Sequence, residues 1–153
     1  MPPASQEAAG PLVCATAEDT IAAGRQLARR LLDARSDRAA VLALSGPLAA
    51  GKTTLVKGVA QELRIAEPIT SPTFALVSQY QIPGDGTLTH VDLYRIESPA
   101  AVESLALDDM LRVSRLMVIE WADRAPDAIP LPTLSVQIDV IDGGGRRLEI
   151  RQA

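Results

Sequence analysis

Residues 46–53 read Gly-Pro-Leu-Ala-Ala-Gly-Lys-Thr, and this stretch decides the fold. It matches the pattern G-x-x-x-x-G-K-[ST] of the phosphate-binding loop, or P-loop. The apolar run Val41–Leu44 precedes it, and Lys52–Leu63 follows it with apolar residues on one helical face. A strand, a glycine-containing loop and a helix in this order are the context that the motif requires. The sequence therefore predicts a site for the phosphates of a nucleotide.

Each residue type in this loop has a chemical reason. The glycines allow backbone N–H groups to turn inward around phosphate oxygens, and the helix N-terminus adds a partial positive charge. Lys52, one of two lysines in the chain, supplies a charge for the β- and γ-phosphates, and Thr53 supplies a hydroxyl for Mg²⁺. Lys52 is expected on the solvent-facing rim. The loop residues expected around the phosphates are Gly46, Ala49, Ala50 and Gly51.

The rest of the chain alternates between predicted strands and helices. Helices are predicted over Ala17–Ala34 and from Ser98-Pro99 towards Leu111, strands over Phe74–Tyr80, Thr87–Tyr94 and Leu116–Ile119, and a hairpin from Leu134–Val140 and Arg147–Arg151 around Asp142–Gly145. This order predicts an α/β fold of the three-layer P-loop NTPase type, with a mainly parallel central sheet and antiparallel edge strands that include the hairpin. One nucleotide-binding domain over residues 1–153 is expected, with residues 1–12 as a flexible N-terminal extension.

Composition excludes several classes of protein. A formal net charge of -4 argues against a large nucleic-acid groove. With Cys14 and His90 as the sole cysteine and histidine, an intrachain disulfide and a Cys/His zinc site are excluded, so any metal must be held mainly by oxygen. Met1–Gly10 lacks the features of a secretory signal, and the apolar-leaning stretch Ala39–Gly51 is too short to cross a bilayer. A cytoplasmic protein with no membrane association is expected.

Two carboxylates are predicted beside the loop. Glu120 follows a wholly apolar run, and Asp92 lies near the end of another predicted strand. Because active sites of such sheets lie at the carboxyl ends of strands, both are expected on one rim with Ser45-Gly46. Either could ligate the metal through water while the other orients the attacking water. Asp92 and Glu120 are therefore the candidate catalytic residues and, with Thr53, the candidate metal ligands, and the sequence leaves the two carboxylate roles open.

Other polar and aromatic positions carry less specific signals. Ser71 and Thr73, on either side of a proline, are candidates for a switch segment that senses the γ-phosphate. Trp121 is expected to anchor a strand end or to pack beside the nucleotide or a partner. His90 is expected to be a satisfied packing residue. Because the chain contains no asparagine, it lacks the Asn-Lys-x-Asp guanine signature, which disfavours a regulatory GTPase.

The order of these motifs resembles the TsaE family. The resemblance rests on Leu44-Ser45-Gly46 through Thr54, then Ser71-Pro72-Thr73-Phe74, then His90-Val91-Asp92-Leu93-Tyr94-Arg95, then Ile119-Glu120-Trp121. It implies a P-loop ATPase that binds ATP or ADP with Mg²⁺ and serves threonylcarbamoylation of adenosine 37 in tRNA. It also implies TsaB and TsaD as partners, which transfer the threonylcarbamoyl group themselves. ATP hydrolysis would be slow without these partners, and tRNA would be acted on through their complex.

The resemblance assigns roles to single residues. Lys52 would hold phosphates, Thr53 would ligate Mg²⁺, Thr54 would touch the nucleotide phosphates, Ser71 and Thr73 would form the switch segment, Asp92 would be the metal-water or catalytic carboxylate, Glu120 the Walker-B-like acid, and Trp121 a nucleotide-side or interface residue. Three positions depart from the family. Pro47 stands where an acid is usual, and Ala49 and Ala106 stand where glycine is usual. Because proline has no N–H and alanine tolerates positive φ poorly, a more rigid loop or weaker nucleotide binding is expected.

Two other functions use the same motifs. A free-standing kinase of a small metabolite would use the loop, Mg²⁺ and a base such as Asp92, but it also needs an acceptor pocket and cations over the transferring phosphate. Arg95 and Arg124 are the nearby candidates for those cations. A nucleotide-dependent interaction switch with negligible turnover is the third reading. The ordered motifs favour the ATPase subunit over both.

Overall fold

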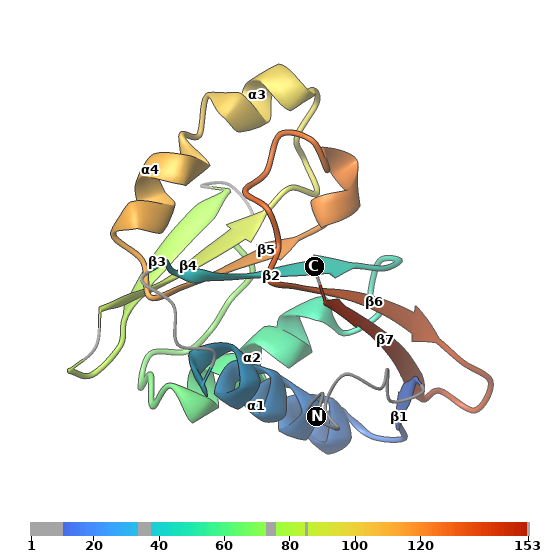
Figure 1. The fold of residues 1–153 in the computed structure, drawn as a ribbon. Coiled ribbons are helices and arrows are strands. Elements are labelled where there is room, and N and C mark those ends of the chain that lie inside the picture. Colours follow the sequence, from blue (N-terminus) through green and yellow to red (C-terminus); the bar gives the residue numbers. More distant parts are fainter. Residues whose placement is uncertain (1–10, 34–37, 73–75, 85, 153) are drawn as a thin grey trace, which may run out of the picture.

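The computed structural model describes residues 11–33, 38–72, 76–84 and 86–152, whose strands form one sheet in the order β1-β7-β6-β2-β5-β4-β3 (Figure 1). The strands are β1 (Leu12–Cys14), β2 (Ala40–Ser45), β3 (Val77–Gln81), β4 (Thr87–Asp92), β5 (Leu116–Glu120), β6 (Leu134–Val140) and β7 (Arg146–Gln152). The helices are α1 (Ala17–Asp33), α2 (Lys52–Glu62), α3 (Pro99–Glu103), α4 (Leu107–Arg112) and the short 3₁₀ helix η2 (Ala122–Arg124).

The centre of the sheet is parallel and its edges are antiparallel. β6, β2, β5 and β4 lie side by side and run in parallel. β3 pairs antiparallel with β4 at one edge, and β7 pairs antiparallel with β6 and β1 at the other. The mainly parallel sheet with antiparallel edges, including the C-terminal hairpin β6–β7, is confirmed.

Helices cover both faces of this sheet (Figure 1). α1 and α2 lie on one face, over a hydrophobic core that contains Leu42 and Leu44 of β2. α3, α4 and η2 lie on the other face, where Val41 and Ala43 of the same strand belong to a second core. Successive residues of a strand point to opposite faces, so a strand covered on both sides is apolar throughout. The predicted three-layer arrangement is confirmed.

Two glycines allow α1 and α2 to pack closely. A Cβ atom at Gly24 would lie 2.1 Å from the carbonyl oxygen of Leu55, and one at Gly58 would lie 2.0 Å from that of Ile21. Larger residues would therefore push the helices apart at both positions. This contact holds α2, whose first two residues are the last two of the phosphate-binding motif, against α1.

The helix predicted from Ser98-Pro99 towards Leu111 is wrong in one respect, because it consists of two helices. α3 ends at Glu103, and α4 starts only at Leu107. Between them Ala106 has a φ of +52°, which is the left-handed region and cannot continue a right-handed helix. The predicted start is confirmed, since the Ser98 side chain accepts an N–H hydrogen bond from the first turn of α3.

The N-terminal strand β1 was not predicted. It pairs with β7, so Leu12, the last residue of the expected N-terminal extension, belongs to the sheet, while residues 1–10 lie outside the described residues. β3 begins at Val77, and Phe74, the predicted first residue of this strand, also lies outside them. Within the described part of the chain, every helix is too short or too polar to cross a membrane.

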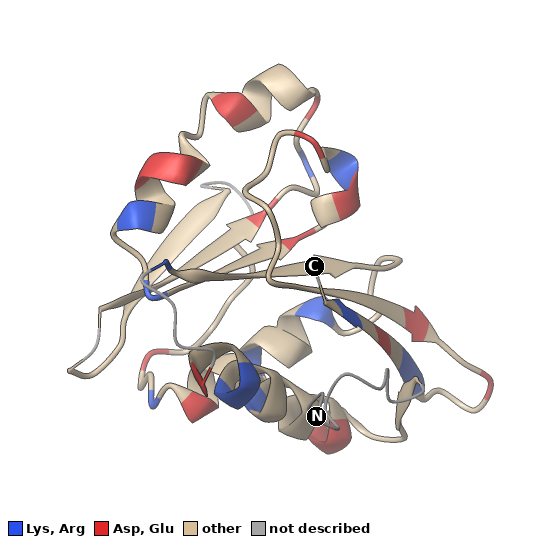
Figure 2. Cartoon of the chain, in the orientation of Figure 1, with Lys and Arg blue, Asp and Glu red and all other residues tan. Residues whose placement is uncertain are grey.

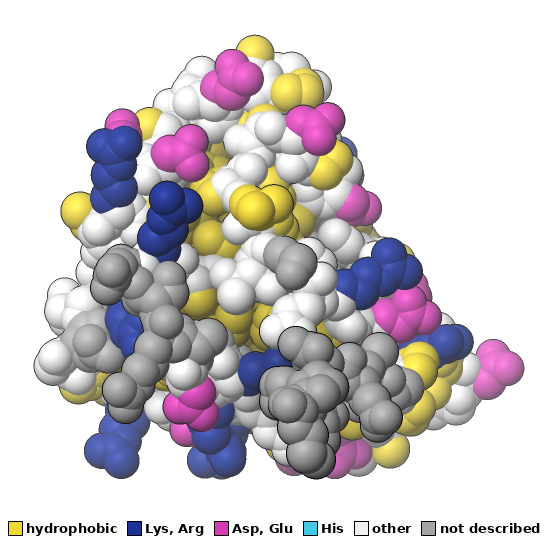
Figure 3. Space-filling model, viewed as in Figure 1, with side chains coloured by type: hydrophobic (Ala, Val, Ile, Leu, Met, Phe, Trp, Pro, Cys, Tyr) yellow, Lys and Arg dark blue, Asp and Glu magenta, His cyan; other side chains and the backbone are white. Residues whose placement is uncertain are grey.

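Charged side chains of both signs are spread over the molecule (Figure 2). Acidic residues stand at the ends of β4 and β5, which are Asp92 and Glu120. On the face shown in Figure 3, acidic and basic side chains are interspersed, and the described residues form no broad basic stripe there. This face therefore offers no continuous basic surface of the kind that binds a polyanion.

Candidate functional site

A cavity of about 360 Å³ lies at the carboxyl edge of the parallel strands. Its walls come from the loop after β2, the N-terminus of α2 and the ends of β4 and β5. The predicted site residues that line it are Ala49, Ala50, Gly51, Lys52, Thr53, Thr54, Ser71, Asp92, Glu120 and Trp121. Gly46 is not among the lining residues, and Thr73 lies outside the described part of the chain. The fold thus brings together positions that are dispersed along the sequence.

The register of the sheet places two carboxylates side by side. Asp92 pairs with Glu120 across β4 and β5, and Glu120 pairs with Leu44 of β2, just before the loop. Both acids are the last residues of their strands, and both line the cavity together with the loop. The common rim predicted from the sequence is confirmed.

The loop between β2 and α2 folds back on itself. The Ala50 N–H donates to the carbonyl oxygen of Pro47 at 3.1 Å. Ala49 has a φ of +63° and Gly51, the N-cap of α2, has a φ of +106°. An alanine in the left-handed region costs about 1–2 kcal/mol, whereas glycine adopts it freely. A Cβ at Gly46 would lie only 2.2 Å from a carbonyl oxygen of β6, so this glycine is required by close packing.

Lys52 is buried, with 5% of its surface exposed, so the prediction that it lies on the solvent-facing rim is wrong. Its Nζ donates to the carbonyl oxygens of Gly46 at 2.7 Å and Pro47 at 2.8 Å, and it lies 3.9 Å from the ring centroid of Trp121. Burial lowers the pKa of this ammonium group, and nearby carboxylates, Glu120 first, oppose the shift. The ammonium group is thus surrounded by two loop carbonyls and the indole ring, and a phosphate would have to displace the carbonyls to bind it.

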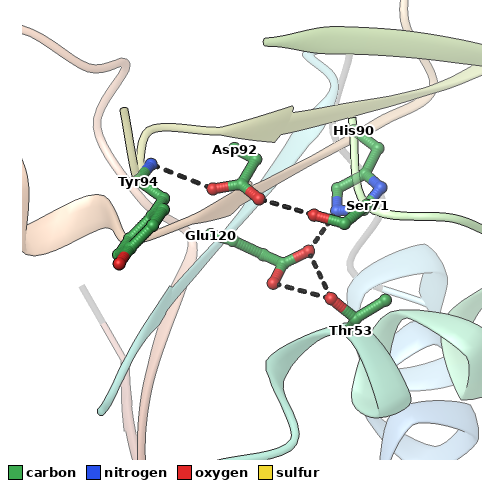
Figure 4. Close-up of polar contacts among 6 residues, drawn as sticks. All are labelled: Thr53, Ser71, His90, Asp92, Tyr94 and Glu120. Carbon is green, nitrogen blue, oxygen red and sulfur yellow. Dashed lines mark hydrogen bonds and ion pairs between the residues drawn. The ribbon is translucent and has the colours of Figure 1, made fainter. Parts of the chain in front are cut away.

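Glu120 is 2% exposed and connects the sheet to α2 (Figure 4). Thr53 Oγ1 donates to its two carboxylate oxygens, at 3.1 Å and 3.2 Å. His90 Nε2 donates to Glu120 Oε2 at 2.5 Å. His90 is fully buried, as predicted for a packing residue, but it is not satisfied, because among the described residues no hydrogen-bond partner reaches its Nδ1. The histidine therefore contacts Glu120 from behind, and it does not line the cavity itself.

Asp92 has different partners from Glu120. It is 8% exposed, and its Oδ2 accepts a hydrogen bond from Ser71 Oγ at 2.7 Å. Its Oδ1 accepts one from the backbone N–H of Tyr94 at 2.9 Å (Figure 4). One carboxylate is thus fastened to the helix after the loop, and the other to the candidate switch segment.

Aromatic rings close one side of the site. The rings of Tyr94 and Trp121 lie 4.9 Å apart between centroids, and the Arg124 guanidinium lies 5.2 Å from each. Trp121 has a φ of +57°, which is uncommon for a bulky residue and marks a strained turn after β5. Such strain is frequent at functional sites, where the surrounding structure holds it.

The sequence did not indicate four of the lining residues: the apolar Leu48 and Leu76, and the polar Tyr94 and Arg146. Tyr94 follows Asp92 by two positions. Alternate residues of an extended chain point to the same face, and this signal could have placed Tyr94 beside Asp92 in the site. Arg146 lines the same cavity, although it lies 96 positions from the loop residue it contacts. Its sequence surroundings carry no signal for this contact. Of the two cations that were anticipated, Arg95 lines the cavity, and Arg124 lies against the aromatic rings.

The donor atoms in the cavity fit Mg²⁺. Among the described residues, no three or more His, Cys, Asp and Glu side chains gather in a way that could hold a metal ion. The hydroxyl of Thr53 and the carboxylates of Glu120 and Asp92 supply oxygen only, which is the donor type that Mg²⁺ prefers. Mg²⁺ usually retains several waters and shares phosphate oxygens, so a few protein oxygens suffice.

Most of the chain is similar to proteins of one family. Residues 14–148 match the family described as Threonylcarbamoyl adenosine biosynthesis protein TsaE. The tRNA threonylcarbamoyladenosine biosynthesis protein TsaE of Treponema pallidum is 36% identical over 138 residues, which are 90% of this chain and 97% of the relative. The protein of the same name from Haemophilus influenzae is 33% identical over 127 residues, which are 83% and 79% of the two chains.

A further relative and a solved structure agree with this match. The TsaE of a Nostoc species is 42% identical over 114 residues, which are 72% of this chain and 68% of the relative. The crystal structure of YdiB from Bacillus subtilis has a TM-score of 0.71 at 26% identity, and the match covers 93% of this chain and 84% of that one. The structural match extends over nearly the whole chain.

Proposed function

The chain belongs to the TsaE family, and from this premise we propose that it is a Mg²⁺-dependent, ATP-binding and ATP-hydrolysing subunit required for threonylcarbamoylation of adenosine 37 in tRNA. It acts on the TsaB–TsaD complex and does not form the bond to adenosine itself. TsaB and TsaD are therefore its partners, and tRNA is reached through them. The proposed place of action is the cytoplasm, because the substrate of the pathway is tRNA.

The contact between Thr53 and Glu120 is the observation that carries this proposal. It joins the residue after the phosphate-loop lysine to the carboxylate at the end of a buried strand. A hydroxyl and a strand-end acid at this distance are the two protein groups that P-loop NTPases bring to Mg²⁺. The pairing supports a site for nucleotide hydrolysis, and it argues against a glycine-rich turn that binds no nucleotide and contains a lysine by chance.

Phosphate binding requires Lys52 to exchange partners. Its Nζ now donates to two loop carbonyls, and the β- and γ-phosphates of ATP, or the β-phosphate of ADP, would take their place. Ala49, Ala50, Gly51 and Thr54 line the cavity, and we assign them to the remaining phosphate oxygens; the Ala50 N–H would exchange its bond to the Pro47 carbonyl oxygen for one to phosphate. The N-terminus of α2 adds its partial positive charge to the same site.

The surroundings of the two carboxylates support separate roles in hydrolysis. When bound, Mg²⁺ would neutralise charge that develops on the phosphates, and Thr53 with Glu120 would hold it. Asp92 is assigned to the attacking water, with a water-mediated contact to the metal, because Ser71 and the Tyr94 N–H fix both of its oxygens. An orientation fixed at two points suits a group that must aim a water at phosphorus.

The segment around Ser71 couples the nucleotide to the partners. Ser71 contacts Asp92, and Thr73, two residues later, is assigned to the same switch. Trp121 lies between the Lys52 ammonium and Tyr94, where it would sense the nucleotide or a partner. Hydrolysis is expected to be slow in the isolated chain and faster once TsaB and TsaD complete the site.

The experiment measures ATP hydrolysis by the purified chain alone, with TsaB and TsaD, and with a set of candidate metabolites. We expect slow turnover alone and about tenfold or greater stimulation by the partners. Lys52→Ala should abolish nucleotide binding, whereas Lys57→Ala, which changes the other lysine on an exposed part of the same helix, should not. Circular dichroism checks that both variants fold. Robust phosphorylation of one metabolite, with no response to TsaB and TsaD, would replace this proposal with a kinase.

A further inference from the structure

Arg146, the first residue of β7, connects the phosphate loop to the C-terminal hairpin. Its Nε donates to the carbonyl oxygen of Ala50 at 2.7 Å, and one terminal nitrogen donates to that of Ala49 at 3.3 Å. The other terminal nitrogen donates to the carbonyl oxygens of Gly144 at 2.6 Å and Gly145 at 3.2 Å. A guanidinium group is planar and presents its donors in a fixed fork, so these bonds hold the loop in one position relative to the hairpin.

Holding two carbonyl groups also orients two amide groups. A trans peptide unit is planar, and its C=O and N–H bonds point in opposite directions. Because Arg146 binds the carbonyls of Ala49 and Ala50, the N–H groups of Ala50 and Gly51 must point away from the guanidinium. Phosphate loops bind anions through backbone N–H groups with a common direction. The Ala50 N–H turns back to the Pro47 carbonyl oxygen, and the arginine orients the Gly51 N–H, next to Lys52, in the part of the loop that would contact phosphate.

The two halves of the loop are held by different groups. Lys52 Nζ donates to the carbonyl oxygens of Gly46 and Pro47, and Arg146 donates to those of Ala49 and Ala50. Residues 47–50 are Pro-Leu-Ala-Ala and have no polar side chain that could bond to the backbone. Gly51, the N-cap of α2, likewise makes no side-chain cap. Ala49 is held at a φ of +63°, a conformation that an alanine disfavours and leaves when the surroundings permit. Arg146 thus holds the half of the loop that contains the strained alanine.

We propose that Arg146 is a positioning residue that holds the phosphate loop in its nucleotide-binding shape and offsets the strain at Ala49. The ligand in this inference rests on the proposed function, whereas the clamp itself rests on the contacts between the hairpin and the loop. The C-terminal hairpin thereby sets nucleotide affinity, although it lies at the far end of the sequence from the P-loop motif.

The test compares Arg146→Met with the wild type in two measurements. Isothermal titration with Mg-ADP should show a dissociation constant about tenfold higher, since hydrogen bonds from a charged group contribute strongly to local order. Hydrogen exchange of the Ala50 amide, measured without nucleotide, should become faster, because the loop no longer has its external clamp. Arg146→Lys, which retains the charge without the fork, should give smaller changes of the same sign and serves if Arg146→Met does not fold.

Two further variants separate positioning from other roles. Arg147→Met is the matched control, because Arg147 pairs with Glu149 at 3.2 Å on the same strand and does not line the cavity. It should change neither the affinity nor the exchange rate. Adding Ala49→Gly to Arg146→Met should restore about threefold of the lost affinity, since glycine adopts a positive φ without strain.

Each outcome decides the inference. Unchanged affinity and unchanged exchange in Arg146→Met would overturn it. Weaker affinity with unchanged exchange and no rescue by Ala49→Gly would also overturn it, in favour of direct contact between Arg146 and the nucleotide. If the wild type binds no Mg-ADP, the proposed function fails, but exchange of the loop amide without nucleotide still decides whether Arg146 orders the loop.

Discussion

Asp92 and Glu120 pair with each other across neighbouring strands, yet their surroundings differ. Glu120 accepts hydrogen bonds from Thr53 and His90, one on α2 and one on β4. Asp92 accepts them from Ser71 and from a backbone N–H two residues along its own chain. Two acids that the sequence could not tell apart are therefore distinguished by their partners. One carboxylate is thus joined to the start of α2 and the other to the candidate switch segment at Ser71.

The largest expected effect is on hydrolysis in Asp92→Asn. If Asp92 orients the attacking water, the single-turnover rate of ATP hydrolysis should fall on the order of 100-fold. The dissociation constant for Mg-ADP should stay within about threefold of the wild type, because the loop and Thr53 are intact. Equal losses of rate and affinity would contradict the comparison and make Asp92 a plain ligand.

A smaller effect is expected on affinity in Glu120→Gln. Loss of a carboxylate beside the metal should weaken binding of Mg-ADP by about tenfold. Binding of ADP in the presence of EDTA should hardly change, since the carboxylate acts through the metal. Titration with and without Mg²⁺ measures this difference, and an equal change under both conditions would remove Glu120 from the metal site.

Ser71→Ala should have a milder effect than either acid substitution. Asp92 would retain the Tyr94 N–H but lose the 2.7 Å bond to the Ser71 hydroxyl. Hydrolysis is expected to fall by about threefold with unchanged affinity. Ser104→Ala is the control, because Ser104 Oγ donates to a carbonyl within its own helix. A stopped assay of phosphate release compares the two, and identical rates would separate Ser71 from the chemistry.

The smallest effect is a shift in pH dependence. The pKa of Lys52 lies below its ordinary value of 10.5, chiefly because of burial. Affinity for Mg-ADP should therefore decline as pH rises through this lowered pKa, because Lys52 loses its charge. Between that pKa and 10.5 the unfolded chain binds the proton that the folded chain has lost, so the contribution of Lys52 to the free energy of unfolding rises with pH. Glu120 opposes the shift more than Asp92 does, so Glu120→Gln should move the decline to lower pH than Asp92→Asn. Titration at several pH values measures both midpoints, and the reverse order would contradict it.

Short sequence patterns were sufficient to predict the phosphate loop, the type of sheet and the position of the two carboxylates. The phosphate loop, the parallel sheet and the shared rim of Asp92 and Glu120 follow from a motif, from apolar strands and from the polarity of parallel strands. The need for a positive φ at Ala49 followed from comparing one residue with the family pattern, and the structure confirms it.

The remaining features depend on contacts that a local pattern does not contain. Lys52 is buried because two carbonyls and an indole ring surround it, and the ring comes from a distant strand end. Arg146 reaches the loop from 96 positions away. Ala106 lies between α3 and α4 in a left-handed conformation although alanine is the best helix former, so its local preference pointed the other way. In each case tertiary structure overrides the local signal.

The most direct measurement quantifies threonylcarbamoyladenosine by mass spectrometry in digested bulk tRNA from source cells depleted of this protein. We expect loss of the nucleoside, restored by the wild type and by Lys57→Ala but not by Lys52→Ala. That pattern would tie the modification to the phosphate loop. An unchanged level of the nucleoside under confirmed depletion, or full restoration by Lys52→Ala, would contradict the central claim.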